Sequence, residues 1–250
     1  MKNIHHQLKL AAAITLALVS LGASSARAED SKPADEVSFN AAITTDYRYR
    51  GISQSRLQPA LQGGVDYVNN PSGLYAGTWL STQKWIKDLG GDGSIEIDVY
   101  GGKKGEIALV PGLSYDVGAL YYYWPSNSLK PSANTFELYG QLGFGPAYVK
   151  YSTSTTNLFG VADSKHSGYL DIGANIDIAT GLVLNLHAGR QEVKHNSAFS
   201  YTDYKIGVTK DFGICSVALA GFYTNTSAYV SPAGKNLGKS GAVFTVSKTF

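Results

Sequence analysis

The sequence has a single cysteine, Cys215, among its 250 residues, and only 16% of the residues are charged. One thiol cannot form an internal disulfide, which excludes a small secreted domain held together by disulfides. No basic cluster that would bind nucleic acid follows the first 28 residues. In the same part of the chain, no apolar run is long enough to form a membrane-spanning helix.

The N-terminal residues have the order of a secretory signal peptide. Lys2 and Lys9 precede an apolar run over residues 10–21, and small residues follow up to Ala28. We therefore predict a signal peptide over residues 1–28 with cleavage after Ala28. The apolar run is shorter than the ~18 residues that a membrane anchor needs. Cleavage would remove three of the 21 basic residues and none of the 19 acidic ones. The net charge of +2 therefore comes from the predicted signal peptide.

What the sequence has in abundance is glycine (28), tyrosine (17) and alternation of apolar with polar residues. A period of two with one apolar face indicates a half-buried β-strand. The first such segment puts these residues on its apolar face: Val37, Phe39, Ala41, Ile43, Thr45 and Tyr47; its other face carries Asn40, Thr44, Asp46 and Arg48. About twelve such segments follow one another, with ten to fourteen possible. They predict an all-β fold, a single transmembrane antiparallel up-and-down β-barrel over residues 36–250, after a periplasmic lead at 29–35.

Short and long connections alternate between these segments. The short ones are rich in Gly, Pro and Asn and lie at residues 69–73, 143–146, 179–181 and 210–213. The long, polar ones lie at residues 50–58, 85–93, 125–134, 156–166, 192–200 and 225–238, and only 104–111 is long for a turn. Short periplasmic turns and longer outer loops are typical of bacterial outer-membrane barrels, with both termini on the periplasmic side.

The predicted inward face is rich in acids. It carries Asp46, Asp66, Glu96, Asp98, Asp116, Glu137, Asp171, Asp177 and Asp203 against Arg48, Lys104, Lys150 and Lys205. Rings of carboxylates favour cations in a pore. We select as pore-lining candidates Asp46, Arg48, Glu96, Asp98, Lys150, Asp171, His187 and Lys205. The alternative is a plugged barrel whose interior charges pair and whose loops bind a partner, since wide channels belong to larger barrels.

Aromatic residues gather near the ends of the predicted strands. The clusters are Tyr47 with Tyr49, Trp79 with Trp85, Tyr121 to Trp124, and Tyr201 with Tyr204. Such rings typically form girdles at the two membrane interfaces, which is the interpretation we favour. A stacking platform for a sugar or a base is the alternative.

Signals for catalysis are weak. His195 and Ser197 resemble the His-x-Ser pair of outer-membrane lipid A deacylases, but they lie in a predicted outer loop, and no third group is evident that would hold the histidine as a base. A lipid-hydrolysing barrel enzyme is therefore the alternative to a channel. We expect no enzyme activity, and the sequence contains no motif for a cofactor, nucleotide or metal.

The last strand resembles the assembly signal of outer-membrane barrels. Gly241, Phe244 and Val246 lie in an alternating segment, and the chain ends on the aromatic residue Phe250. This pattern implies an interaction with the outer-membrane assembly machinery.

Several runs resemble the TorF-type family of outer-membrane porins. They are ITTDYRYRGISQ at residues 43–54, EIDVYGG at 96–102, YDVG at 115–118 and TFELY at 135–139. The resemblance implies a bacterial outer-membrane porin and supplies no catalytic residue. Taken together, the sequence predicts a porin-like channel, surrounded by outer-membrane lipid, for passive passage of small hydrophilic solutes or ions, with a preference for cations.

Overall fold

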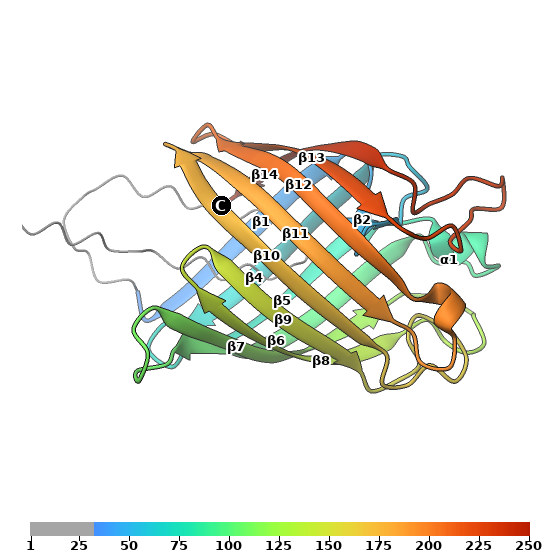
Figure 1. The fold of residues 1–250 in the computed structure, drawn as a ribbon, viewed down its shortest axis with the longest axis horizontal. Helices are drawn as coiled ribbons and strands as arrows, with labels where there is room; N and C mark the ends of the chain where they lie inside the picture. The colour runs from blue at the N-terminus through green and yellow to red at the C-terminus, as the bar shows by residue number, and fades with distance from the viewer. Residues whose placement is uncertain (1–32) are drawn as a thin grey trace, which may run out of the picture.

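The computed structural model describes residues 33–250, in which twelve antiparallel strands close into one barrel (Figure 1). The predicted signal peptide with its cleavage site at Ala28, and residues 29–32, lie outside the described residues. The barrel strands are β1 (Asp35–Thr44), β4 (Ala60–Asn69), β5 (Leu74–Thr82), β6 (Ile95–Glu106), β7 (Leu113–Tyr123), β8 (Thr135–Phe144), β9 (Ala147–Ser154), β10 (Gly168–Ala179), β11 (Leu182–Glu192), β12 (Tyr201–Asp211), β13 (Ser216–Thr224) and β14 (Gly241–Thr249).

The barrel closes between its first and last strands. β1 pairs with β4 on one side and with β14 on the other, so every strand has two neighbours. The main chain of Phe250 extends this closure, because its N–H donates to the carbonyl of Phe39 (2.8 Å) and its carbonyl accepts from Phe39 (3.2 Å). Closure leaves the twelve-stranded sheet of residues 35–249 without an unpaired edge. The predicted fold class and strand number are confirmed.

The two faces of the strands differ as the alternation predicts. In β6, Ile95 and Val99 are exposed on the outside, whereas Glu96 and Asp98 are buried inside. The exposed outer surface carries large apolar side chains around the barrel, among them Val37, Phe39, Leu61, Val117, Leu138, Ile172, Ile206, Leu219 and Phe244. A continuous apolar belt of this kind suits lipid rather than water.

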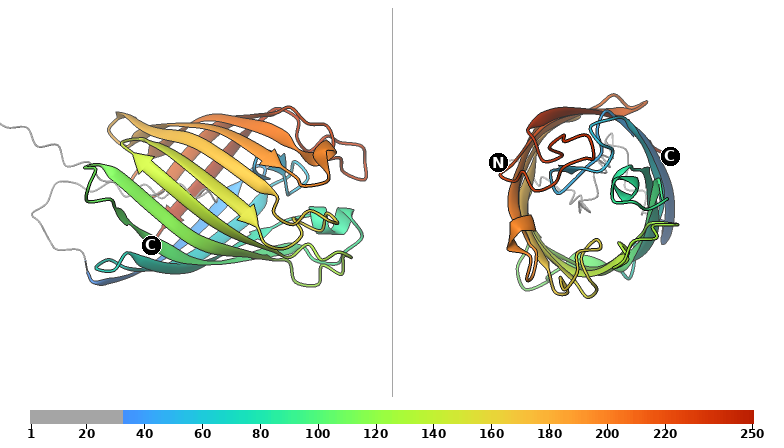
Figure 2. Two further views of the ribbon diagram at one scale, coloured as in Figure 1. Left: turned by 60° about the horizontal axis from the view of Figure 1, so that its bottom comes forward. Right: turned by 90° about the vertical axis from the view of Figure 1, so that its right-hand side faces the viewer.

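The two ends of the barrel are unequal. Both ends of the described chain and the tight connections at residues 70–73, 107–112, 145–146, 180–181 and 212–215 share one end, here named the turn end. The long connections at residues 45–59, 83–94, 124–134, 155–167, 193–200 and 225–240 share the other, the loop end. Viewed from the loop end, several of these loops lie within the outline of the ring (Figure 2).

The predicted first strand is too long at its C-terminal end. β1 ends at Thr44, and the chain then turns into the barrel to form a small hairpin from β2 (Arg48–Tyr49) and β3 (Ile52–Ser53). Two short helices, α1 (Trp85–Asp88) and η1 (Ser197–Phe199), lie in loops of the same end. None of the helices in residues 33–250 has the length and apolarity needed to cross a membrane.

Candidate functional site

The hairpin that enters the barrel is held by a buried carboxylate. Asp46 accepts hydrogen bonds from Arg48 Nε (2.8 Å) and from the hydroxyls of Ser53 (2.5 Å) and Ser55 (3.2 Å). Arg48 Nη1 also donates to the carbonyl oxygens of Gly51 (3.0 Å) and Lys239 (2.8 Å). These bonds tie residues 46–55 to one another and to the loop before β14.

The sequence contains a glycine where this hairpin meets the barrel wall. Gly51 has φ +78°, and a Cβ at this position would lie 2.7 Å from Thr224 Cγ2 and 2.8 Å from Asp203 Cβ. Any larger residue would therefore push the hairpin away from β12 and β13.

Arg50, the residue before this glycine, reaches across the interior. Its guanidinium donates to Glu137 Oε2 on β8 (2.7 Å) and to Gln191 Oε1 on β11 (2.8 Å). The same group lies over the rings of Tyr49 (4.8 Å to the centroid) and Tyr169 (4.2 Å). A planar, permanently charged group with several donors suits this role, because it can satisfy two acceptors and stack at the same time.

A histidine joins two carboxylates on the neighbouring wall. His187 Nδ1 lies 2.8 Å from Asp171, and its Nε2 lies 2.7 Å from Asp203. The hydroxyl of Tyr169 donates to Asp203 (2.8 Å). These four residues come from β10, β11 and β12, whose antiparallel pairing aligns Asp171 and Asp203 through Gly189, two residues along β11 from His187.

The acids of β6 have a different environment. Glu96 accepts hydrogen bonds from the hydroxyl of Tyr47 (2.8 Å) and from the indole N–H of Trp124 (3.1 Å), which are both uncharged donors. Asp98 is fully buried, and neither of its carboxylate oxygens has a hydrogen-bond partner among the described residues. Buried carboxylates without a cationic partner are costly, which makes this pair a candidate for function.

Nearer the turn end, tyrosines bind the interior acids. Tyr75 donates to Asp116 (2.5 Å) and also contacts the hydroxyl of Tyr139, and Tyr100 donates to Asp66 (2.5 Å). Of the remaining predicted interior residues, Lys150 Nζ lies 3.9 Å from the centre of the Tyr139 ring, and Lys104 lies over Tyr75. Asp177 is exposed close to the turn end.

The interpretation of the aromatic clusters as girdles is wrong for most of their members. Tyr47, expected on the lipid face, is 2% exposed and packs edge-on against Trp79 inside the barrel. The inner set also includes Tyr49, Trp85, Tyr122, Trp124 and Tyr201, whereas Tyr121, Tyr123 and Tyr204 face outward. Tyr47 and Tyr49 enter with the hairpin. Tyr122 and Trp124 could have been found from the sequence, because the alternation that places Tyr121 and Tyr123 outside places them inside.

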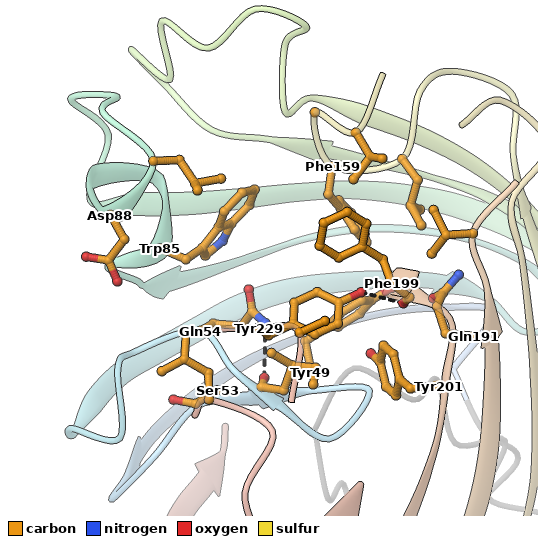
Figure 3. A pocket seen from close by; sticks show the side chains of 18 of the residues that line it. Tyr49, Ser53, Gln54, Trp85, Asp88, Phe159, Gln191, Phe199, Tyr201 and Tyr229 are labelled. Carbon is orange, nitrogen blue, oxygen red and sulfur yellow. Dashed lines mark hydrogen bonds between the residues drawn. The ribbon is translucent and has the colours of Figure 1, made fainter. Parts of the chain in front are cut away.

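The hairpin lies between two cavities. On the loop-end side is an aromatic cavity of about 270 Å³, defined by Trp85, Trp124, Phe159, Phe199, Tyr201 and Tyr229 with their neighbours (Figure 3). Burial raises the pKa of the Tyr229 hydroxyl, so this group stays protonated and donates to the carbonyl of Phe199 (2.8 Å). On the other side is a polar cavity of about 90 Å³, lined among others by Arg50, Glu137, Lys150, His187 and Lys205. Tyr49 and Tyr122 line both cavities.

The eight pore-lining candidates divide into groups. Asp46 and Arg48 lie in the hairpin rather than on β1, and Arg48 also lines the polar cavity. Glu96 and Asp98 lie together on β6, where Glu96 lines the aromatic cavity. The other four, Lys150, Asp171, His187 and Lys205, line the polar cavity. Sequence reasoning missed Arg50, which it left in an outer loop.

The pair that resembles a deacylase motif lies at the loop end. His195 Nδ1 lies 2.9 Å from the carbonyl oxygen of Asp163, and Ser197 begins η1. Residues 33–250 contain no group of three or more His, Cys, Asp or Glu side chains placed to hold a metal ion.

Comparison with known proteins identifies the family. A family model described as "Bacterial protein of unknown function (Gcw_chp)" matches residues 27–250. The chain belongs to this family. A search of curated proteins finds no match for this Gcw_chp member. The narrower resemblance to TorF-type porins stays a prediction.

Two solved porins have a fold similar to this Gcw_chp barrel. The KdgM porin, alone or in complex with disordered oligogalacturonate, has a TM-score of 0.53 at 5% identity, with 86% of this chain and 97% of that chain covered. The NanC porin has a TM-score of 0.54 at 9% identity, with 86% and 98% covered. At such low identities the likeness concerns the fold.

Proposed function

We propose that this protein is an outer-membrane channel for the passive passage of small hydrophilic solutes or ions, with a preference for cations. An apolar outer belt around a polar interior supports a membrane channel. The porin-like fold and the resemblance of residues 43–54 to TorF-type porins support the same assignment. In this proposal the chain performs no catalysis.

The observation that carries the cation preference is the charge balance inside the barrel. In residues 33–250 the buried acids are Asp46, Glu96, Asp98, Asp116, Glu137, Asp171 and Asp203, and the buried bases are Arg48 and Lys150. Arg50, whose side chain is 7% exposed, adds a third interior base, and Lys205 and His187, which line the polar cavity, add two more, so the acids still outnumber the bases. Carboxylates in a narrow, low-dielectric passage attract cations and repel anions. This argues against carrying over oligogalacturonate, a polyanion, from the KdgM porin to this chain.

The proposed location follows from the predicted signal peptide and from the unequal ends of the barrel. Export would end with cleavage after Ala28, and the segment from Gly241 to Phe250 would be read by the assembly machinery. We place the turn end and both termini in the periplasm and the loop end outside the cell, because outer-membrane barrels have short periplasmic turns.

Planar-bilayer recording of the purified barrel tests this function. We expect discrete conductance steps and, in a salt gradient, a reversal potential with the sign of a cation-selective pore. An anion-selective pore would contradict the cation preference alone.

The inward hairpin favours a second candidate, a structural barrel that does not conduct. Asp46, Arg48 and Arg50 hold residues 46–55 inside the barrel. The same hydrogen bonds and ion pairs would also stabilise a permanent plug. Absence of conductance from folded protein, both in the wild type and after the hairpin is released, would favour this second candidate.

A further inference from the structure

The aromatic cavity at the loop end has walls suited to a ligand. Trp85, Trp124 and Phe159 form one group of contacting rings, and Phe199, Tyr201 and Tyr229 form another. Figure 3 shows rings from both groups around one space. Leu89 (63% exposed) and Val230 (51% exposed) also line the cavity, so it reaches solvent at the loop end.

The charged residues of this cavity have one sign. They are Asp88 and Glu96, and no Lys, Arg or His among residues 33–250 lines the space. Asp88 is paired with Arg56, but Glu96 is held by the uncharged donors Tyr47 and Trp124. Asp98, two residues along the same inner face, has no hydrogen-bond partner in residues 33–250. A carboxyl group without a protein counter-ion, that of Glu96, therefore lies at the wall of the aromatic cavity.

Most polar groups around the space are already occupied. Tyr229 donates to a carbonyl, Tyr49 bonds Tyr122, and Gln191 binds Arg50 and two main-chain carbonyls. A sugar would lose hydration of its hydroxyls without finding enough new partners. An alkylated ammonium group needs no hydrogen bonds, because the faces of aromatic rings and a nearby carboxylate stabilise its charge.

We propose that the aromatic cavity binds small organic cations that carry a quaternary ammonium group. The volume of about 270 Å³ is sufficient for such a head group with a short chain, since a cavity of ~150 Å³ accepts benzene. The proposal deepens the proposed function, on which it rests, by naming a class of cation that would collect above the hairpin.

Binding of choline and of its neutral isostere, 3,3-dimethylbutan-1-ol, to the detergent-solubilised full barrel tests the charge requirement. The two molecules have nearly the same shape and differ in the positive charge. We expect choline to bind at least about tenfold more tightly, measured by calorimetry or tryptophan fluorescence. Equal affinities, or no binding of choline, would overturn the proposal.

Two variants test separately how the carboxylate and the aromatic rings contribute to choline binding. Glu96→Gln should weaken choline at least about fivefold and leave the neutral isostere unchanged, because only the charge is removed. Tyr229→Leu should also weaken choline, whereas Tyr223→Leu, on the outer face, should not. An affinity for choline unchanged in both Glu96→Gln and Tyr229→Leu would overturn the assignment to this cavity.

Conductance of the same samples distinguishes this inference from the proposed function. A barrel that conducts cations but does not discriminate choline from its isostere would refute the inference alone. A barrel that binds choline but never conducts would refute the channel and leave the cavity assigned.

Discussion

The guanidinium of Arg50 lies 2.7 Å from the carboxylate of Glu137. This contact joins the hairpin to β8, although the hairpin itself packs against β12 and β13. Gly51, the next residue, approaches β12 and β13, while Glu137 belongs to β8. One side chain therefore crosses the interior between the two cavities. Its contacts hold the hairpin inside the proposed channel.

Arg50→Ala should enlarge this passage. Removing one partner of a buried ion pair costs about 3–5 kcal/mol, because the other charge is left unpaired. The hairpin should then leave the interior more often, and single-channel conductance should rise. Arg56→Ala is the control, since Arg56 pairs with Asp88 at the loop end and is 35% exposed. Conductance of Arg50→Ala equal to that of the control would show that the bridge does not limit flow.

Substitutions at Glu96 and Asp98 should reduce the cation preference. Glu96→Gln with Asp98→Asn removes two buried acidic groups, so the reversal potential in a salt gradient should move toward zero. Asp92→Asn, an exposed acid at the loop end, should change it little. The wild-type preference should also weaken at 1 M salt, where the screening length falls to ~3 Å. A double variant as selective as the wild type would contradict this assignment.

Removal of an interior basic residue should strengthen the cation preference. Arg48 is a poor choice, because it bonds Asp46 and two carbonyl oxygens and holds the hairpin. Lys205 lines the polar cavity, so Lys205→Gln should strengthen the cation preference measured by reversal potential. A weaker preference in this variant would be the opposite of what we expect.

Arginine on the outer face should destabilise the barrel far more than arginine at the neighbouring inner position. Ile206 is 62% exposed on β12, and an arginine facing lipid near the membrane midplane costs ~2–4 kcal/mol. Lys205→Arg places the same side chain inside and should leave stability close to wild type. Unfolding in urea from lipid vesicles compares the two, and equal midpoints would mean that the outer face does not contact lipid.

Replacement of Phe250 should affect assembly more than stability. Phe250→Ala keeps both main-chain hydrogen bonds to Phe39, whereas deletion would remove them, so the substitution isolates the side chain. We expect unassembled protein in the periplasm and an unchanged unfolding midpoint for the fraction that assembles. Phe212→Ala, an exposed aromatic at the turn end, is the control. Normal membrane yield of Phe250→Ala would remove the predicted assembly signal.

The sequence by itself determined the barrel. Alternation with a period of two fixes which side of each strand faces lipid, so it placed Glu96 and Asp98 inside and Val99 and Ile172 outside. The same rule would also have placed Tyr122 and Trp124 inside, where we instead predicted a membrane-interface girdle from their aromatic character. Local composition also separated tight turns from long loops, because turn residues are chosen for their backbone conformations.

Only the tertiary structure decided what fills the barrel. No periodic pattern in the sequence predicts the hairpin. The two partners of Arg50 lie 87 and 141 residues away in the chain. Tyr47 continues the apolar alternation of β1, yet it turns inward because Glu96 and Trp79, 49 and 32 positions later, provide its partners. Contacts between residues so far apart depend on how the closed barrel brings strands together, which local patterns do not encode.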